Sequence, residues 1–235
     1  MSDFGKAPNG EVVKKFKLTN SNGLSMEVIN YGAIITNLYV PDSSGSLKDV
    51  VLGFNDFNNY YENNPYFGAI IGRYGNRISN GTFLLDGVRY ELEQNNGTNS
   101  LHGGLVGFDK VFWKFIEEKS SNQSLYFEHY SKDMEEGFPG NLVVGVEYIL
   151  NDSNELKIKY IASTDKKTII NLTQHSYFNL SGESSGDILD HILNIDADYY
   201  LPVNENMIPN GPYEKVESTP FDFNYPKKIG LDIFV

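Results

Sequence analysis

The sequence predicts an all-β protein, a large antiparallel sandwich or barrel. Apolar residues recur with a period of two over most of its 235 residues, as they do in half-buried strands. Clusters of Gly, Asn, Asp and Ser interrupt these runs at intervals of about 8 to 12 residues, as turns between short strands do. No long stretch has the apolar spacing of three and four that an amphipathic helix requires. Any helix is therefore expected to be short, and 55–61 is the best candidate.

The clearest strand pair lies between residues 82 and 92. Phe83 and Leu85 alternate in the first half, and apolar residues alternate again in the second. Between the two halves stands Asp86-Gly87, a pair that readily adopts the two positive φ angles of a type I′ turn. The segment is therefore predicted to be a tight β-hairpin.

Two longer pairs of strands are predicted in the middle of the chain. The first joins 112–116 to 125–129 through the polar stretch 117–124. The second joins 142–150 to 156–160, with one apolar face and with lysines of the returning strand pointing to water. This alternation is typical of an antiparallel sheet that is buried on one face.

The last residues are expected to lack packing partners. Residues 220–223 are predicted to form a strand that enters a loop, and the chain then stops in the apolar run 230–235. With no linker and no internal repeat in the sequence, we expect a single domain over 1–235 that is incomplete at its C-terminal end.

Composition excludes several classes of function. There is no cysteine, so disulfides and thiolate metal sites are excluded. The formal net charge of −12 argues against binding to nucleic acid or to an anionic membrane, because such surfaces require clustered Lys and Arg. No run is as long and apolar as a membrane span, and the first residues lack the apolar stretch of a secretory signal. The cytosol is the expected compartment.

Gly72–Ile78 is a first candidate for ligand binding. Arg73 stands between two glycines there, and Asn76 and Arg77 follow the second glycine. Their N–H groups could bind the hydroxyls of a ligand, since glycine lets the backbone approach closely. The alternative is an arginine that only satisfies loop carbonyls, and the sequence leaves both interpretations open.

Two histidines stand in similar settings. His102 precedes a Gly pair in 99–104, which leaves room for a ligand on its open side. Further along, Thr173, His175 and Tyr177 alternate and would share one face of a strand, a polar line that a dry core would not tolerate without partners. Each histidine could instead be a satisfied structural residue.

The other two histidines, His129 and His191, show no companion residues and are interpreted as structural or surface positions. The sequence has no His-x-His or His-Glu-x-x-His pattern and no phosphate-binding glycine loop. Neither a metal nor a cofactor is therefore expected.

At these segments the sequence resembles the aldose 1-epimerases, the mutarotases of the galactose pathway. The matching segments keep the family's order along nearly the whole chain. They are 30–33, 51–54, 72–78, 99–104, 136–140, 175–182 and 200–203. The resemblance implies a large antiparallel β-sandwich of the galactose mutarotase type. It also implies interconversion of the α and β anomers of hexoses such as glucose and galactose, without a cofactor.

The resemblance also implies roles for individual residues. His175 matches the general acid of the family, and a histidine whose pKa is near neutral pH suits that task. His102 matches a second histidine that holds the sugar near its ring oxygen. The resemblance implies sugar contacts for three groups of residues: the pair Asn76 and Arg77, His102, and the strand residues Ser176 and Tyr177.

One departure from the family puts activity in doubt. Members usually continue beyond this length and there supply an Asp, a Gln and the Glu that acts as general base. No carboxylate of this chain matches that Glu, so weak or absent activity is expected. Two alternatives stay open: a noncatalytic sugar-binding or regulatory protein, and a hexose-6-phosphate epimerase. The second would need a basic cluster that the motif segments do not supply.

Overall fold

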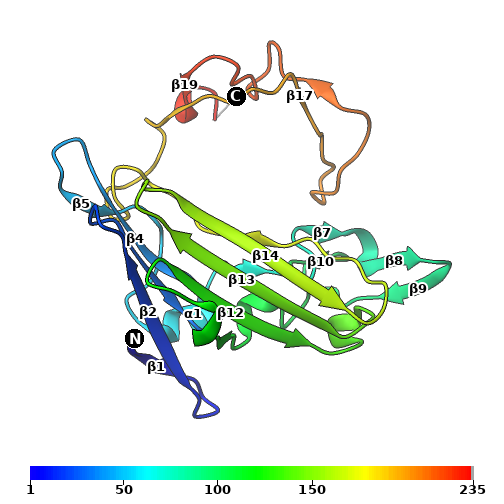
Figure 1. The fold of residues 1–235 in the computed structure, drawn as a ribbon. Helices are drawn as coiled ribbons and strands as arrows, with labels where there is room; N and C mark the ends of the chain where they lie inside the picture. The colour runs from blue at the N-terminus through cyan, green and yellow to red at the C-terminus, as the bar shows by residue number, and fades with distance from the viewer. Residues whose placement is uncertain (234–235) are drawn as a thin grey trace. The chain divides into compact units, whose positions relative to one another are not determined.

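A computed structural model describes residues 1–233. The chain forms two compact units, residues 1–178 and 179–235, and each is described by itself (Figure 1). The prediction of one domain over the whole chain stays a prediction.

The first sheet of unit 1 is antiparallel and has the strand order β1-β2-β3-β4-β5. Its strands follow one another along the chain, so that each connection is a turn between neighbours. They are β1 (Ser2–Lys6), β2 (Val12–Thr19), β3 (Ser25–Ile29), β4 (Ile35–Pro41) and β5 (Leu47–Asp49).

The second sheet of unit 1 has the order β11-β12-β13-β14. Its strands are β11 (Lys114–Phe115), β12 (Ser124–Ser131), β13 (Leu142–Leu150) and β14 (Leu156–Thr164), of which the last three lie side by side in Figure 1. Both strand pairs predicted in the middle of the chain are thereby confirmed. Alternate residues of β13 are buried, whereas Lys157 and Lys159 of β14 are exposed.

The two sheets enclose one apolar core. Phe16 of the first sheet contacts Phe115 and Phe127 of the second, with ring centroids 4.5 and 5.2 Å apart. Met26 and Tyr148, one from each sheet, are fully buried in the same cluster. The Tyr148 hydroxyl donates a hydrogen bond to the Ala33 carbonyl at 2.7 Å, which satisfies a polar group that would otherwise be costly to bury. The predicted antiparallel β-sandwich is confirmed.

The predicted hairpin is also present, as β8 (Thr82–Leu85) and β9 (Val88–Glu91). Asp86 and Gly87 have φ of 50° and 79°, as the type I′ turn requires. Two pairs of very short strands complete unit 1: β6 (Ile70–Ile71) with β15 (Thr173–Gln174), and β7 (Arg77–Ile78) with β10 (Ser100–Leu101).

The helices are short, as predicted. Helix α1 (Phe57–Asn63) begins two residues after the predicted start, because the Asp56 side chain accepts a hydrogen bond from the Asn59 N–H at 3.1 Å and caps the helix. The 3₁₀ turns are η1 (Ser79–Gly81), η2 (Phe108–Lys110), η3 (Glu117–Lys119), η4 (Glu135–Gly137) and η5 (Ile229–Leu231). No helix within residues 1–233 is long and apolar enough to cross a membrane.

Within the described residues, the strands of unit 2 are two residues long and lie in antiparallel pairs. They are β16 (Ile192–Leu193) with β19 (Lys227–Lys228), and β17 (Tyr199–Tyr200) with β18 (Glu214–Lys215). The prediction of a strand at 220–223 is wrong, because residues 220 and 221 lie in a turn and residues 222 and 223 belong to no regular element. The Phe221 N–H donates to the Thr219 hydroxyl and the Asn224 N–H to the Asp222 carboxylate, and such local bonds compete with strand pairing.

The apolar run 230–235 lies partly outside the described residues. Within them, Leu231 and Ile233 are exposed.

Candidate active site

Unit 1 has a hollow of about 560 Å³ that gathers the predicted site residues. Five of the six line it, and they come from segments far apart in the sequence. The lining consists of Gly75, Asn76, His102, Asn171, Leu172, Thr173, Gln174, His175, Ser176 and Tyr177. The sixth, Arg77, donates from Nε to Asn96 Oδ1 at 2.9 Å and from Nη1 to Asn76 Oδ1 at 3.4 Å, so it is tied to a lining residue.

Short strand pairs bring these segments together. Leu101 of β10 pairs with Arg77 of β7, and Thr173 of β15 pairs with Ile71 of β6. The segment that holds His175 is further fixed by two backbone hydrogen bonds, from the His175 N–H to Ala69 at 2.9 Å and from Gly68 to the His175 carbonyl at 3.2 Å. The site therefore depends on the packing of unit 1 as a whole.

The hydrogen bonding of His102 defines how it can act. Its Nδ1 accepts a hydrogen bond from the Asn76 N–H at 2.9 Å, so in the neutral ring the proton is on Nε2. Burial, and then the nearby His175 and Arg77, lower the pKa of His102 from 6.5 to about 4. At neutral pH His102 is therefore an uncharged ring whose Nε2–H can donate to a ligand.

The two histidines lie against each other. The ring centroids of His102 and His175 are 5.3 Å apart and the ring planes are nearly perpendicular, at 89°. His175 also contacts the ring of Tyr177 at 5.0 Å. Two imidazoles beside one hollow can supply a hydrogen-bond donor and a proton-transfer group to the same ligand.

Two residues that sequence reasoning did not assign hold the loop around His102. The Asn95 side chain donates to the carbonyls of Leu101 and Gly104 at 2.9 and 2.8 Å and accepts from the Leu101 N–H at 2.7 Å. The Glu136 carboxylate accepts from the N–H groups of Leu105 at 2.7 Å and Val106 at 3.2 Å. Glu136 lies in one of the segments that carry the family resemblance, but its sequence context gives no sign of this contact.

The two arginines of the first motif have different roles. Arg73 is 2% exposed. It donates to the Ser131 hydroxyl and to four backbone carbonyls, those of Ser131, Lys132, Phe138 and Pro139, at 2.7 to 3.5 Å. The alternative interpretation, an arginine that satisfies loop carbonyls, is therefore correct for Arg73. Arg77 is the arginine tied to the lining of the hollow.

Asp109 is a buried carboxyl group in the same region. Its side chain is 5% exposed, and its Oδ1 has no hydrogen-bond partner among the described residues. Desolvation raises the pKa of Asp109 from 3.8 to about 6, although Lys110, with Nζ 3.8 Å from Oδ2, opposes the shift. A buried, unpaired acceptor of this kind costs stability whenever it is charged.

Asp109→Asn is therefore expected to stabilise unit 1 at pH 7.5, by about 1–3 kcal/mol. The folded state binds the Asp109 proton more tightly than the unfolded state, so the cost is fully present above pH 6 and disappears as the pH falls towards 3.8. Urea unfolding followed by the fluorescence of Trp113, the single tryptophan, measures the gain at each pH. Asp86→Asn, at a carboxylate that is 61% exposed, is the control. An equal effect of both substitutions, or a gain in stability that persists at pH 4, would contradict the proposed cost of the charged Asp109 side chain.

None of the residues lining the unit 1 hollow, within the described part of the chain, carries a carboxylate. The hollow therefore offers imidazole, amide, hydroxyl and phenol groups, but no carboxylate that could act as a base.

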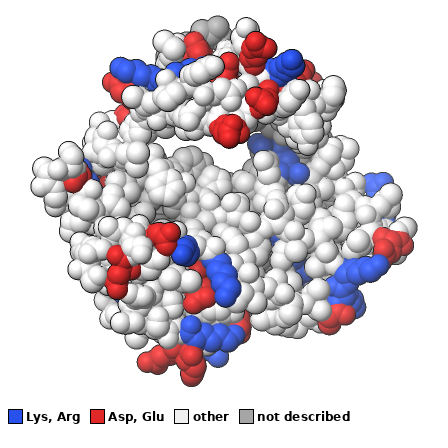
Figure 2. All heavy atoms as spheres, turned by 45° about the horizontal axis from the view of Figure 1, so that its top comes forward, with Lys and Arg blue, Asp and Glu red and all other residues white. Residues whose placement is uncertain are grey.

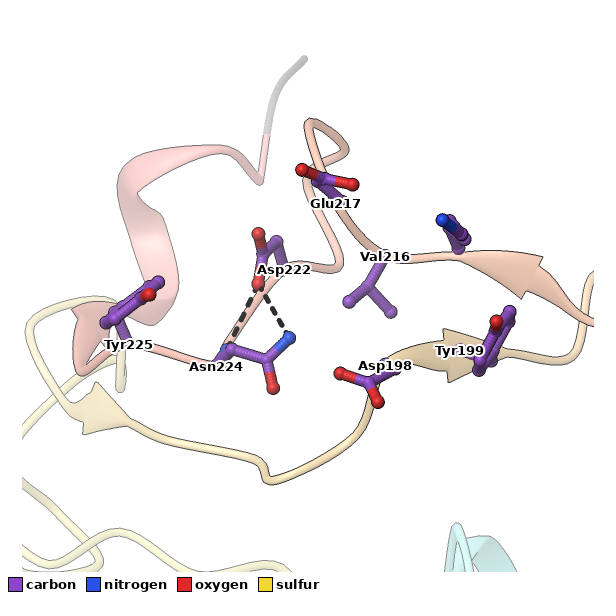
Figure 3. A pocket seen from close by; sticks show the side chains of 8 residues that line it. Asp198, Tyr199, Val216, Glu217, Asp222, Asn224 and Tyr225 are labelled. Atoms are coloured by element: carbon purple, nitrogen blue, oxygen red, sulfur yellow. Dashed lines mark hydrogen bonds between the residues drawn. The ribbon is translucent and has the colours of Figure 1, made fainter.

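Unit 2 has a second hollow of about 530 Å³, shown in Figure 3. Acidic and aromatic residues line it together with Lys215, Asn224 and the buried Val216. Asp222 in it already accepts hydrogen bonds from Asn224. It contains none of the predicted site residues, so we assign the site to the hollow in unit 1.

Charged residues are mixed on the surface. On the face that Figure 2 shows, Lys and Arg lie beside Asp and Glu and form no continuous basic patch. Several are paired, such as Lys15 with Glu27 at 2.7 Å and Lys166 with Asp133 at 2.9 Å.

The fold is shared with solved structures of sugar epimerases, which defines the class of protein. An aldose epimerase homologue from C. elegans has a TM-score of 0.87 at 31% identity, over 92% of this chain and 66% of that one. A galactose 1-epimerase from Lactobacillus acidophilus has a TM-score of 0.84 at 29% identity, over 97% and 66%.

The chain belongs to the aldose 1-epimerase family, whose model matches residues 14–234. It is 47% identical to a galactose mutarotase of Sus scrofa over 97% of this chain and 66% of that protein. It is 40% identical to an aldose 1-epimerase of Escherichia coli over 96% and 64%. The chain thus spans about two thirds of the length of these relatives.

Proposed function

We propose that this chain binds hexoses in the unit 1 hollow and promotes the interconversion of their α and β anomers. The observation that carries the proposal is the juxtaposition of His102 and His175 in one hollow, with ring centroids 5.3 Å apart. The relatives named as galactose mutarotase and aldose 1-epimerase support galactose and glucose as substrates.

The reaction requires two proton movements. As the bond between C1 and the ring oxygen breaks, the ring oxygen gains a proton and the C1 hydroxyl loses one. The open aldehyde then rotates about its bond to C2, and the ring closes on the other face of C1. Acid and base groups held at fixed positions lower the barrier to both transfers.

The lining residues, together with Arg77 beside them, divide these tasks. His175 delivers the proton to the ring oxygen, while the Nε2–H of His102 donates a hydrogen bond near the same atom. Asn76 and Arg77 bind hydroxyl groups, and Ser176 and Tyr177 border the sugar from the strand extension. A site built from such groups discriminates against ligands that leave its polar atoms unpaired.

The missing carboxylate limits the rate. A general base contributes about 10²–10⁴-fold to the rate of a proton-transfer reaction. We therefore expect the acceleration of mutarotation by this chain to be smaller, by that factor, than that of an enzyme with such a base. The same observation favours a second candidate, a sugar-binding protein without catalysis. A hexose-6-phosphate epimerase is disfavoured, because no Lys or Arg lines the hollow within the described residues. We also propose that the protein is cytosolic.

Polarimetry of fresh α-D-galactose and α-D-glucose tests the proposal, with buffer as the blank and the Sus scrofa galactose mutarotase in parallel. We expect the rate of mutarotation to exceed that in buffer, and the acceleration to be about 10²–10⁴-fold smaller than that by the relative. Binding of methyl galactoside, followed by NMR of its own protons, is measured on the same sample. Binding without acceleration would support the noncatalytic candidate, and a folded chain that neither binds nor accelerates would overturn both.

A further inference from the structure

Tyr66 contacts both histidines of the site, although sequence reasoning gave it no role. Its ring centroid lies 4.7 Å from that of His102, with an interplanar angle of 69°, and 5.6 Å from that of His175, with an angle of 33°. Since the two imidazoles are themselves 5.3 Å apart, the three rings form a closed triangle.

The backbone around Tyr66 is held in place. Tyr66 has φ of 68°, a conformation that non-glycine residues adopt only when their surroundings impose it. Its carbonyl accepts from the Ala69 N–H at 3.1 Å, and the Asn64 side chain accepts from the Phe67 N–H at 2.7 Å. Gly68 follows, where a Cβ atom would lie 2.1 Å from the Ile35 carbonyl oxygen. The turn therefore presents the Tyr66 ring from a fixed position.

We propose that Tyr66 is a positioning residue, whose ring fixes the relative orientation of His102 and His175 and shields both imidazoles from water. This rests on the proposed function, because the two histidines are the groups that would contact the sugar. An orientation set before the sugar binds avoids the cost of ordering these side chains on binding.

The electrostatics of the triangle agree with the geometry. His102 is faced by His175, Arg77 and Tyr66, and burial is the main reason that its pKa is lowered. Burial and the charge of Asp109 raise the pKa of Tyr66 above its usual value, so its ring stays uncharged at neutral pH. Removing the ring would admit water to His102 and stabilise its charged form.

A purely structural tyrosine would behave differently. It would lower overall stability on substitution without changing the titration of one particular histidine. The aromatic ring, and not the hydroxyl, makes the contacts with His102 and His175. Tyr66→Phe should therefore keep the ring contacts with both imidazoles, whereas Tyr66→Leu should remove them.

Proton NMR titration of the four histidines tests the proposal in the intact chain without any sugar. His102→Ala and His175→Ala assign the two site resonances. In Tyr66→Leu the pKa of His102 should rise from about 4 towards 6.5, by at least ~1 unit, while Tyr66→Phe should titrate like the wild type. Tyr213→Leu, at a tyrosine of unit 2 that is 71% exposed, is the control. The resonances of His129 and His191 report whether each variant is folded.

An unchanged His102 titration in folded Tyr66→Leu would overturn the proposal. If that variant does not fold, nuclear Overhauser contacts between the Tyr66 ring and both imidazoles in the wild type decide instead, and their absence would overturn it. Methyl galactoside binding should weaken about 10-fold in Tyr66→Leu, and less in Tyr66→Phe, through lost preorganisation. The titration needs no sugar, so the two proposals can fail separately. If the chain binds no sugar, the proposed function is overturned, and the titration still decides the role of Tyr66.

Discussion

Replacing Arg73 with methionine is expected to lower the free energy of unfolding of unit 1 by about 3–5 kcal/mol. The substitution keeps an apolar stem but removes the guanidinium of a residue that is 2% exposed. That group donates to Ser131, Lys132, Phe138 and Pro139. Of the acceptors left behind, those of Ser131, Phe138 and Pro139 belong to buried residues. The carboxylate of Glu135, whose charge favours the Arg73 cation, also loses that partner. Such a loss is a large fraction of the stability of a typical domain.

Urea unfolding followed by Trp113 fluorescence measures this effect, because Trp113 is buried in the core of unit 1. Arg73→Lys should also destabilise strongly, since an ammonium cannot reproduce the planar fork of donors. Arg89→Met is the matched control: the side chain of Arg89 is 64% exposed, with Nε 3.6 Å from Glu91, and its loss should cost less than about 0.5 kcal/mol. Equal unfolding midpoints for Arg73→Met and Arg89→Met would contradict the structural role of Arg73.

The strands that could be predicted are those with their own local signal. The hairpin of β8 and β9 and the pair β13 and β14 each combine alternating apolar residues with a turn, and both are present. The two-residue strands could not be predicted, because their pairing is fixed by packing between distant segments. At 220–223 the sequence pattern predicted a strand that is not present, because the side chains of Thr219 and Asp222 accept local hydrogen bonds that compete with strand pairing.

The candidate site also has features that the sequence predicts and features that it does not. Motifs with glycine beside His or Arg identified the segments that meet at the hollow, and His102 and Asn76 are joined there by a direct hydrogen bond. The separate roles of Arg73 and Arg77 could not be read from a motif in which both stand near glycines. Tyr66 and Glu136 were missed because their contacts with the site come from loops whose sequences show no matching pattern.

His175→Ala is expected to lower the acceleration of mutarotation by about 10²–10⁴, or to the rate of buffer, because it removes the proton donor for the ring oxygen. That factor corresponds to about 3–5 kcal/mol of barrier. An interaction made mainly in the transition state affects kcat more than KM. We therefore expect a large fall in kcat and a small change in KM, whereas His102→Ala should raise KM through the lost hydrogen bond.

The control for His175→Ala is a histidine that lies outside the site. In unit 2, His191 Nε2 accepts a hydrogen bond from the Leu180 N–H at 2.9 Å, and His191→Ala should leave the polarimetric rate unchanged. Acceleration that survives in folded His175→Ala would exclude His175 as the acid. The remaining imidazole in the hollow, His102, would then be the group to test, although a pKa of about 4 makes it a weak candidate for carrying a proton at neutral pH. The kcat and KM of both histidine variants must therefore be measured.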